Sequence, residues 1–149
     1  MTDDYTEPLL AHEVLARARK DMAQYGKGRG SLFDIGFPDP RGVVSLDLWD
    51  EMIAGLCKEA PRCLLGAIKG ARGEYNICSF PEDDDPAVAA LADAIIESGT
   101  QRGSDNIHTV YGWNDGILPD SRSIPTKEEA VAMLEKAEAL AFTRLVEGS

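Results

Sequence analysis

The chain has 149 residues, of which 44% are hydrophobic and 28% charged, and its 26 acidic and 15 basic side chains give a formal net charge of −11. This length and apolar content predict one globular domain over residues 1–149, with its core from about residue 7 to residue 146, and exclude a disordered chain. The negative charge repels phosphate groups and anionic lipids, so it disfavours direct nucleic-acid backbone binding and membrane attachment, and it permits a protein partner with basic groups.

Targeting signals are not expected at the start of the chain. The first ten residues, MTDDYTEPLL, are acidic, whereas a secretory signal begins with basic residues and continues with an apolar stretch. No apolar run approaches the roughly 18 residues that a membrane-spanning helix needs. We therefore expect a cytoplasmic protein whose three cysteines are reduced, since an odd number in a chain of this length does not indicate a disulfide framework.

Two amphipathic helices and a hairpin are expected in the first half of the chain. Apolar residues recur at helical spacing over residues 7–25, and the Gly-rich sequence GKGRG that follows suits a helix end. A second helix is expected to begin after Ser45, its N-cap, and to end before Pro61. Between the two helices, apolar residues 31–37 and 43–44 flank the turn sequence PDPRG, which predicts a short β-hairpin.

The second half is expected to be mostly helical. Residues 63–71, CLLGAIKGA, fit a strand or a short helix by periodicity, and their small side chains favour a closely packed helix. Asp85 is the expected N-cap of the next helix. Residues 107–113 alternate weakly between apolar and polar, which predicts a short strand or extended segment, and Thr126 with Glu129 forms a capping box for the last helix. The predicted fold is mainly α, within the α+β class, with four or five helices and one hairpin.

No metal site, cofactor or catalytic residue is predicted. The acidic run at residues 82–85 lacks the alternating ligands and the turn glycine of a calcium loop, whereas acidic residues at a helix start favour the helix by about 0.3–1 kcal/mol each. The cysteines and the two histidines, His12 and His108, lack zinc-binding spacing, although a Cys–His pair could still meet in space. Neither GxSxG nor GxxxxGK[ST] occurs, so the chain is not predicted to be a hydrolase or nucleotide-binding enzyme of those types.

The most distinctive local sequence is YGWNDG, which begins at residue 111. Two interpretations are open. In the first, Tyr111 and Trp113 stack on a ligand, and Asn114 and Asp115 hold its polar edge, with Cys63 also in the pocket. In the second, which the turn-forming neighbours favour, the tryptophan fills the core and the amide and carboxylate bond to backbone groups. These five residues are the candidate binding site.

Several segments taken together resemble a known family. They are the EVLARA-type N-terminal helix, the Gly-rich turn and hairpin, CLLGA at residues 63–67, WND at residues 113–115, and the Thr-x-x-Glu start of the last helix. In this order, from about residue 13 to residue 140, they resemble the domain of unknown function 6197, which is found in actinobacteria and their phages. The resemblance implies a small, mainly helical domain and a source, but no reaction.

Three functions follow as hypotheses. The acidity, the lack of a catalytic signature and a resemblance that includes phages favour a non-enzymatic, protein-binding accessory protein that modulates a host factor and is encoded by a phage or prophage. The alternative is a small-molecule-binding protein or enzyme with a pocket around residues 111–115. A DNA-mimicking inhibitor would need carboxylates arrayed along one elongated face. The apolar face of the last helix suits a dimer interface as well as a core, so the sequence leaves the oligomeric state open.

Overall fold

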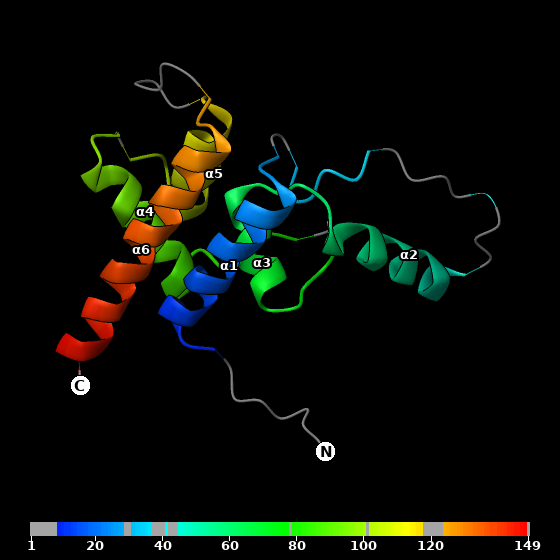
Figure 1. Ribbon diagram of the computed structural model, residues 1–149, viewed down its shortest axis with the longest axis horizontal. Coiled ribbons are helices and arrows are strands. Elements are labelled where there is room, and N and C mark those ends of the chain that lie inside the picture. The colour runs from blue at the N-terminus through cyan, green and yellow to red at the C-terminus, as the bar shows by residue number, and fades with distance from the viewer. Residues whose placement is uncertain are drawn as a thin grey trace.

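The chain folds into helices joined by irregular segments (Figure 1). The computed structural model describes residues 9–28, 31–36, 41, 45–77, 79–100, 102–117 and 124–148. These residues form six helices: α1 (Ala11–Tyr25), α2 (Leu46–Lys58), α3 (Leu64–Ala71), α4 (Pro86–Glu97), α5 (Asn106–Asp115) and α6 (Lys127–Glu147). The mainly α class is therefore confirmed, with six helices where four or five were predicted. Over these same ranges, no helix has both the length and the apolar character needed to cross a bilayer.

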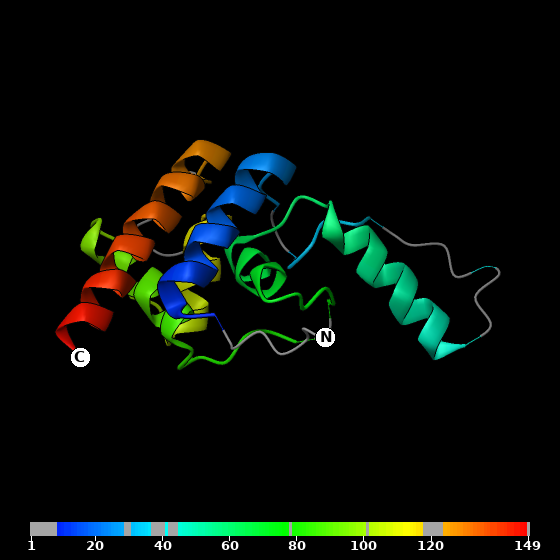
Figure 2. The same ribbon diagram turned by 60° about the horizontal axis from the view of Figure 1, so that its bottom comes forward.

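Five of the helices share one core. α1 packs against α6 and α3, α4 packs against α6 and α5, and α3 contacts α5. Each of these helices contributes apolar side chains without exposed surface, for example Leu15, Leu65, Leu91, Val110 and Leu134. Burial of one such side chain contributes about 1.5–3 kcal/mol. Figures 1 and 2 both show α2 to one side of this bundle, so the core holds α2 mainly through the buried Ile53 and Cys57 at its C-terminal half.

Three predicted helix starts are confirmed by their caps. The Ser45 hydroxyl accepts a hydrogen bond from the backbone N–H of Leu48 at 3.2 Å, at the start of α2. The Asp85 carboxylate accepts from two backbone N–H groups at the start of α4. Thr126 and Glu129 form both hydrogen bonds of a capping box at the start of α6. Such caps are local in sequence, which is why the pattern alone located them.

The predicted β-hairpin is not confirmed. The described residues contain only isolated bridges, in which Arg62 pairs with Lys27 and with Phe33. The backbone N–H of Cys63 also donates to the Leu32 carbonyl at 3.1 Å. The segment after α1 therefore pairs with the residues before α3, about 30 positions away in sequence, and a local turn pattern cannot reveal such a pairing. Residues 37–40 and 42–44, which carry most of the predicted turn and its second arm, lie outside the described residues.

Two further boundaries differ from the predictions. Residues 107–113 belong to helix α5, so the expected strand is wrong. The Asp105 carboxylate accepts from the backbone N–H of His108 at 2.7 Å, and the Asp83 carboxylate accepts from that of Ile107 at 2.8 Å. These two caps, with burial against α4, outweigh the weak local preference for extended structure. α1 begins at Ala11 rather than near residue 7, and residues 7 and 8 lie outside the described residues.

A buried arginine holds the end of α2. Arg62 has no exposed surface. Its guanidinium lies over the rings of Tyr25 and Phe33, at 4.9 and 5.2 Å from their centroids. It donates to three carbonyls at the end of α2, those of Cys57, Lys58 and Ala60. A cation at a helix C-terminus is favourable because the free carbonyls carry partial negative charge, so this side chain fixes α2 to the bundle.

Candidate functional site

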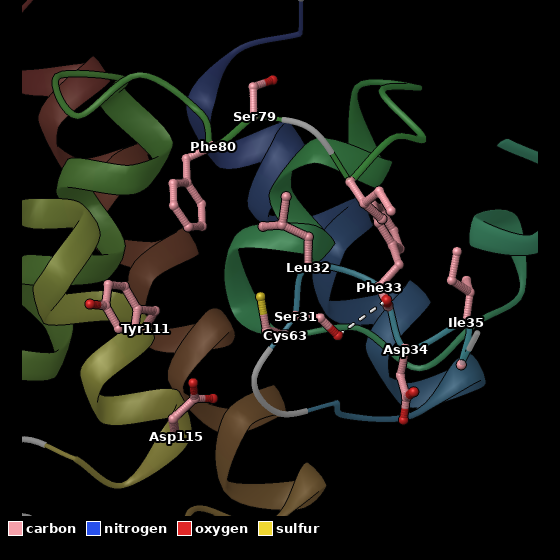
Figure 3. Close-up of a pocket in the computed structure, with 12 residues that line it drawn as sticks. Ser31, Leu32, Phe33, Asp34, Ile35, Cys63, Ser79, Phe80, Tyr111 and Asp115 are labelled. Carbon is pink, nitrogen blue, oxygen red and sulfur yellow. Dashed lines mark hydrogen bonds between the residues drawn. The ribbon is translucent and has the colours of Figure 1, made fainter. Parts of the chain in front are cut away.

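An open cavity of about 610 Å³ lies between α3, α5 and two connecting segments. We call it the α3–α5 cavity. Figure 3 shows its lining as sticks. The described lining consists of residues 31–36, Cys63, Ile77, Ser79, Phe80, Tyr111 and Asp115. Three of the five residues proposed from sequence, Cys63, Tyr111 and Asp115, therefore meet at one cavity although they come from different parts of the chain.

The inner wall of the cavity depends on a glycine in α3. A Cβ on Gly66 would lie 1.9 Å from the carbonyl oxygen of Leu32, a distance at which any side chain would displace the backbone. Glycine thus lets residues 31–36 lie directly against α3, and this confirms the close packing predicted from the small residues of this helix. Leu32 and Cys63 lie near the centre of the lining in Figure 3.

Cys63 is a buried thiol at the start of α3. Its Sγ accepts a hydrogen bond from the backbone N–H of Gly66 at 3.4 Å. Burial raises the pKa of this thiol to about 11, more than the hydrogen bonds to the helix N-terminus lower it. The thiol is therefore neutral near pH 7, whereas a cysteine nucleophile reacts as the thiolate. No histidine occurs among the described residues that line the cavity, so the lining does not bring an imidazole to this sulfur.

The helical form of α5 decides which candidate residues face the cavity. Tyr111 and Asp115 are four residues apart and lie on the same side of the helix, and both line the cavity. Trp113 is about 200° around the helix from Tyr111, and it packs partly buried against the core. A ligand held between the tyrosine and the tryptophan would need both rings on one side, which an extended segment could provide but α5 does not.

Asn114 joins three parts of the fold. It has no exposed surface. Its Oδ1 accepts from the backbone N–H of Leu64 at 3.1 Å, and its Nδ2 donates to the Gly28 carbonyl at 3.2 Å and to Asp115 Oδ1 at 2.9 Å. Its own carbonyl accepts from Lys27 Nζ at 2.8 Å. The amide thus connects α5 to the start of α3 and to the segment after α1, and it orients the neighbouring carboxylate toward its place in the cavity wall.

An aromatic pair forms another wall. The rings of Phe80 and Tyr111 are stacked, with centroids 6.3 Å apart and an interplanar angle of 4°. The segment that carries Phe80 is held by Lys69, whose side chain is 1% exposed. Its ammonium donates to Asn76 Oδ1 at 2.7 Å and to the carbonyl of Ser79. Phe80 was not among the predicted site residues. The one sequence signal for this segment was Lys69, which lies within the apolar run CLLGAIKGA. A lysine buried with that run needs acceptors for its ammonium group, and the segment before α4 supplies them.

The charged groups in the lining are both acidic. They are Asp34, on the segment after α1, and Asp115, at the end of α5. None of the described lining residues is basic. Asp34 was also not predicted, because nothing in its local sequence distinguishes it from the other surface acids. The cavity therefore combines apolar and aromatic walls with negative charge.

The acidic run at residues 82–85 acts within the fold. Asp85 caps α4 and pairs with Arg72, with Nη1 and Oδ2 2.6 Å apart. Asp83 caps the start of α5. Over the ranges that the structure describes, no three His, Cys, Asp or Glu side chains are grouped as metal ligands. Cys57 and Cys63 are free thiols, and Cys78 lies outside the described residues.

A second surface of interest lies on α2. We define the outer surface of α2 as the exposed leucines and acids that are distributed around this helix: Leu46, Leu48, Leu56, Asp47, Asp50 and Glu51. The three leucine side chains are 80%, 46% and 43% exposed, in chain order. This combination of exposed apolar and acidic side chains lies on the helix that stands to one side of the bundle (Figure 2).

Comparison with known proteins gives one match. A model of the family described as "Family of unknown function (DUF6197)" matches residues 6–140. The matched region contains α1 to α5 and most of α6, so the α3–α5 cavity and the outer surface of α2 both lie within it. No curated protein and no solved structure matches the chain. The match therefore supplies a family but no activity.

Proposed function

The chain belongs to the family of unknown function DUF6197, and we propose that it is a non-enzymatic accessory protein that binds another protein through the outer surface of α2. The observation that carries this proposal is the exposure of three leucines on one helix outside the shared core. Isolated exposed leucines are common, but apolar residues grouped on one element are typical of interaction sites.

The apolar side of α2 is wider than the part that the bundle covers. Ile53 and Cys57 are buried, and they account for the contact with the core. Leu48, Met52 and Leu56 are spaced four residues apart, so they form a second row along the helix. Leu46 continues the row of Ile53 and Cys57 at the free end of the helix, where it is 80% exposed, and it lies about 200° around the helix from Leu48. Burial of each leucine by a partner would contribute up to about 1.5–3 kcal/mol, enough for a helix-in-groove contact of moderate affinity.

The neighbouring charges favour a basic partner. Asp47, Asp50 and Glu51 are exposed beside the leucines. A second copy of the chain would bring these same acids against one another, and its net charge of −11 would add repulsion. We therefore commit to a different protein, with an apolar groove flanked by lysine or arginine. We propose that the chain is encoded by a phage or prophage and that its partner is a protein of the host cytoplasm.

DNA mimicry has less support than protein binding. Several acids act at helix starts, and Asp93 pairs with both Arg102 and Arg144. Carboxylates that cap helices or pair with arginines are poor copies of a row of free phosphates. Small-molecule binding is the second candidate function, because the α3–α5 cavity is large enough for a drug-sized ligand.

The proposal can be tested by comparing variants in one affinity capture. The bait is the full chain, incubated with a lysate of the organism that encodes it and read by quantitative mass spectrometry at low and high salt. Wild type is compared with the double variant Leu46→Ser/Leu48→Ser. The control is Phe142→Ser/Val146→Ser, because these side chains are also exposed, at 52% and 58%, but lie on α6.

We expect the capture to recover a protein that binds to wild type and to the α6 control but not to the α2 variant. Its capture should weaken with salt and with Asp47→Lys/Glu51→Lys, because both remove charge attraction. Circular dichroism establishes that each variant keeps its helices. Recovery of no such α2-dependent protein at low salt, or equal recovery by the α2 variant, would reject the proposal.

A further inference from the structure

We propose that the α3–α5 cavity binds a neutral organic molecule with a flat aromatic ring. This binding goes beyond the protein contact through α2, and it names a ligand class for the second candidate function. The juxtaposition that carries it is the stacked pair of Phe80 and Tyr111 beside apolar walls, in one cavity of about 610 Å³. Neither carboxylate of the lining is available to the space beside these rings.

The aromatic pair leaves ring surface open to a ligand. Its rings are parallel to within 4°, and their centroids are 6.3 Å apart. Rings in direct contact have planes about 3.5–4.0 Å apart, so this centroid distance offsets the two rings sideways by about 5 Å, and each covers little of the other's face. The Phe80 side chain is 58% exposed. A flat aromatic ligand can therefore stack on it in the offset geometry that aromatic pairs prefer.

The rest of the lining surrounds the body of the ligand with apolar side chains. Leu32, Phe33 and Ile77 belong to it. Figure 3 shows Phe80 and Tyr111 on one side of the cavity, Phe33 on the other side, and Leu32 between them. Ligand pockets are typically concave and mostly apolar, with volumes of about 300–1,000 Å³. The α3–α5 cavity has this size and this composition.

The Asp115 carboxylate is already engaged. Its Oδ1 accepts from Asn114 Nδ2 at 2.9 Å, and Lys27 lies at the same wall, where its Nζ donates to the Asn114 carbonyl at 2.8 Å. Burial is the main cause of the raised pKa of the Cys63 thiol, and the two charges act on this pKa in opposite directions, since Asp115 raises it and Lys27 lowers it. This wall therefore offers no uncompensated charge to a ligand.

The other acid of the lining, Asp34, faces away from the aromatic pair. It is exposed, and Figure 3 shows its carboxylate near Phe33 and directed away from Phe80 and Tyr111. Its charge therefore remains hydrated. An ammonium or carboxylate group that moved from water to the ring pair would lose hydration without gaining a counter-charge, whereas a neutral group loses less. The lining thus favours a neutral ligand over either charged form.

The walls are held in position before a ligand binds. The Lys69 ammonium donates to Asn76 Oδ1 at 2.7 Å and holds the segment that carries Phe80. Gly66 lets Leu32 lie directly against α3, since a Cβ there would be 1.9 Å from the Leu32 carbonyl oxygen. Walls fixed in this way reduce the entropy lost on binding.

A matched set of probes tests the ligand class. 2-Naphthylmethanol is the neutral aromatic probe, 2-naphthylmethylamine and 2-naphthoate are its charged counterparts, and decahydro-2-naphthylmethanol is its saturated analogue. Binding of each to the full chain is measured by isothermal titration calorimetry and by ligand-observed NMR. We expect 2-naphthylmethanol to bind at least about threefold more tightly than either charged probe, because of their lost hydration. It should also bind about threefold more tightly than the saturated analogue, because only the aromatic probe stacks.

Matched variants test the location. Phe80→Ala should weaken binding of 2-naphthylmethanol by about three- to tenfold, which corresponds to the loss of one aromatic pair. Phe142→Ala is the control, because it removes a ring of similar exposure, 52%, from α6, and it should leave binding unchanged. Phe80→Leu keeps an apolar side chain, so it should weaken binding of the aromatic probe more than that of the saturated analogue.

Two further variants keep the test valid and separate. Ile77→Ala removes another exposed part of the lining and replaces the Phe80 variants if circular dichroism shows that they do not fold. The α2 double variant should retain binding of 2-naphthylmethanol, which separates this test from that of the protein contact.

Three results would overturn the proposal. The first is no saturable binding of 2-naphthylmethanol up to its solubility limit. The second is binding of a charged probe or of the saturated analogue that is as tight as that of 2-naphthylmethanol. The third is binding that Phe80→Ala, or Ile77→Ala in its place, weakens no more than Phe142→Ala does.

Discussion

The substitution Asn114→Asp tests how far the fold depends on one buried amide. The change preserves size and replaces an NH₂ group by an oxygen. Oδ1 can still accept from Leu64, but the donations to the Gly28 carbonyl and to Asp115 Oδ1 are lost. The Gly28 carbonyl and Asp115 Oδ1 would then face an oxygen in place of a donor, at a position without solvent exposure. We therefore expect a large loss of stability from a change of one atom.

The magnitude follows from the contacts. Each lost hydrogen bond reduces the free energy of unfolding by about 1 kcal/mol. The new charge lies beside Asp115, but the Lys27 ammonium bonds to the backbone carbonyl of the same residue and offsets part of the cost, so the total is about 2–4 kcal/mol. A domain of this size has an unfolding free energy of about 5–15 kcal/mol, so the variant should unfold at a much lower urea concentration.

The loss should also depend on pH. Burial and the neighbouring carboxylate raise the pKa of the introduced carboxyl above its unfolded value of about 3.9. Below that value both states are protonated, and the neutral group can donate one hydrogen bond. As the pH rises toward the folded pKa, the loss grows by up to about 1.4 kcal/mol per pH unit, because the unfolded state releases the proton first.

Urea unfolding followed by circular dichroism, at several pH values between about 5 and 8, measures both effects as a difference from wild type. Asn106→Asp is the matched control. It also removes a donated hydrogen bond, from Nδ2 to the Asp83 carbonyl at 3.0 Å, but this position at the start of α5 is not buried, and Oδ1 still accepts from Arg102. We expect the control to change stability by less than about 1 kcal/mol. A loss below about 1 kcal/mol for Asn114→Asp at pH 7, or a loss that does not change with pH, would refute the reasoning.

Three further predictions concern the residues around the cavity and the end of α2. Gly66→Ala should lower the unfolding free energy by at least about 1–3 kcal/mol in the same urea assay, because its Cβ would overlap the Leu32 carbonyl. Gly55 has open space around it, so the control Gly55→Ala should be neutral or stabilising. Equal effects of the two substitutions would contradict the packing of residues 31–36 against α3. Cys63 should react with iodoacetamide far more slowly at pH 8 than after unfolding, because burial raises its pKa to about 11 and only the thiolate reacts; mass spectrometry measures the rate, and equal rates would refute this. Arg62→Lys should lower the melting temperature, since one ammonium cannot reach all three carbonyls at the end of α2; an unchanged melting temperature in differential scanning calorimetry would show that these bonds contribute little.

The candidate site was predictable only in part. YGWNDG attracted attention because it groups aromatic and polar residues, and Tyr111 and Asp115 do line the cavity. Their partners Asp34 and Phe80 are far away in sequence and have no distinguishing local pattern. They join the site because Gly66 admits the segment after α1, and because Lys69 holds the segment before α4. The binding role of the five proposed residues remains a prediction.

The sequence by itself determined the class of the fold and the starts of α2, α4 and α6, because a cap and an apolar stripe act within a few residues of each other. Tertiary structure alone decided the form of residues 106–115 and of the segment after α1. The helix α5 is capped in part by Asp83, 24 positions before Ile107, and the segment after α1 bonds to the residues around Arg62 instead of forming a hairpin. Contacts over such distances depend on how the whole chain packs, and for this reason no local pattern contains them.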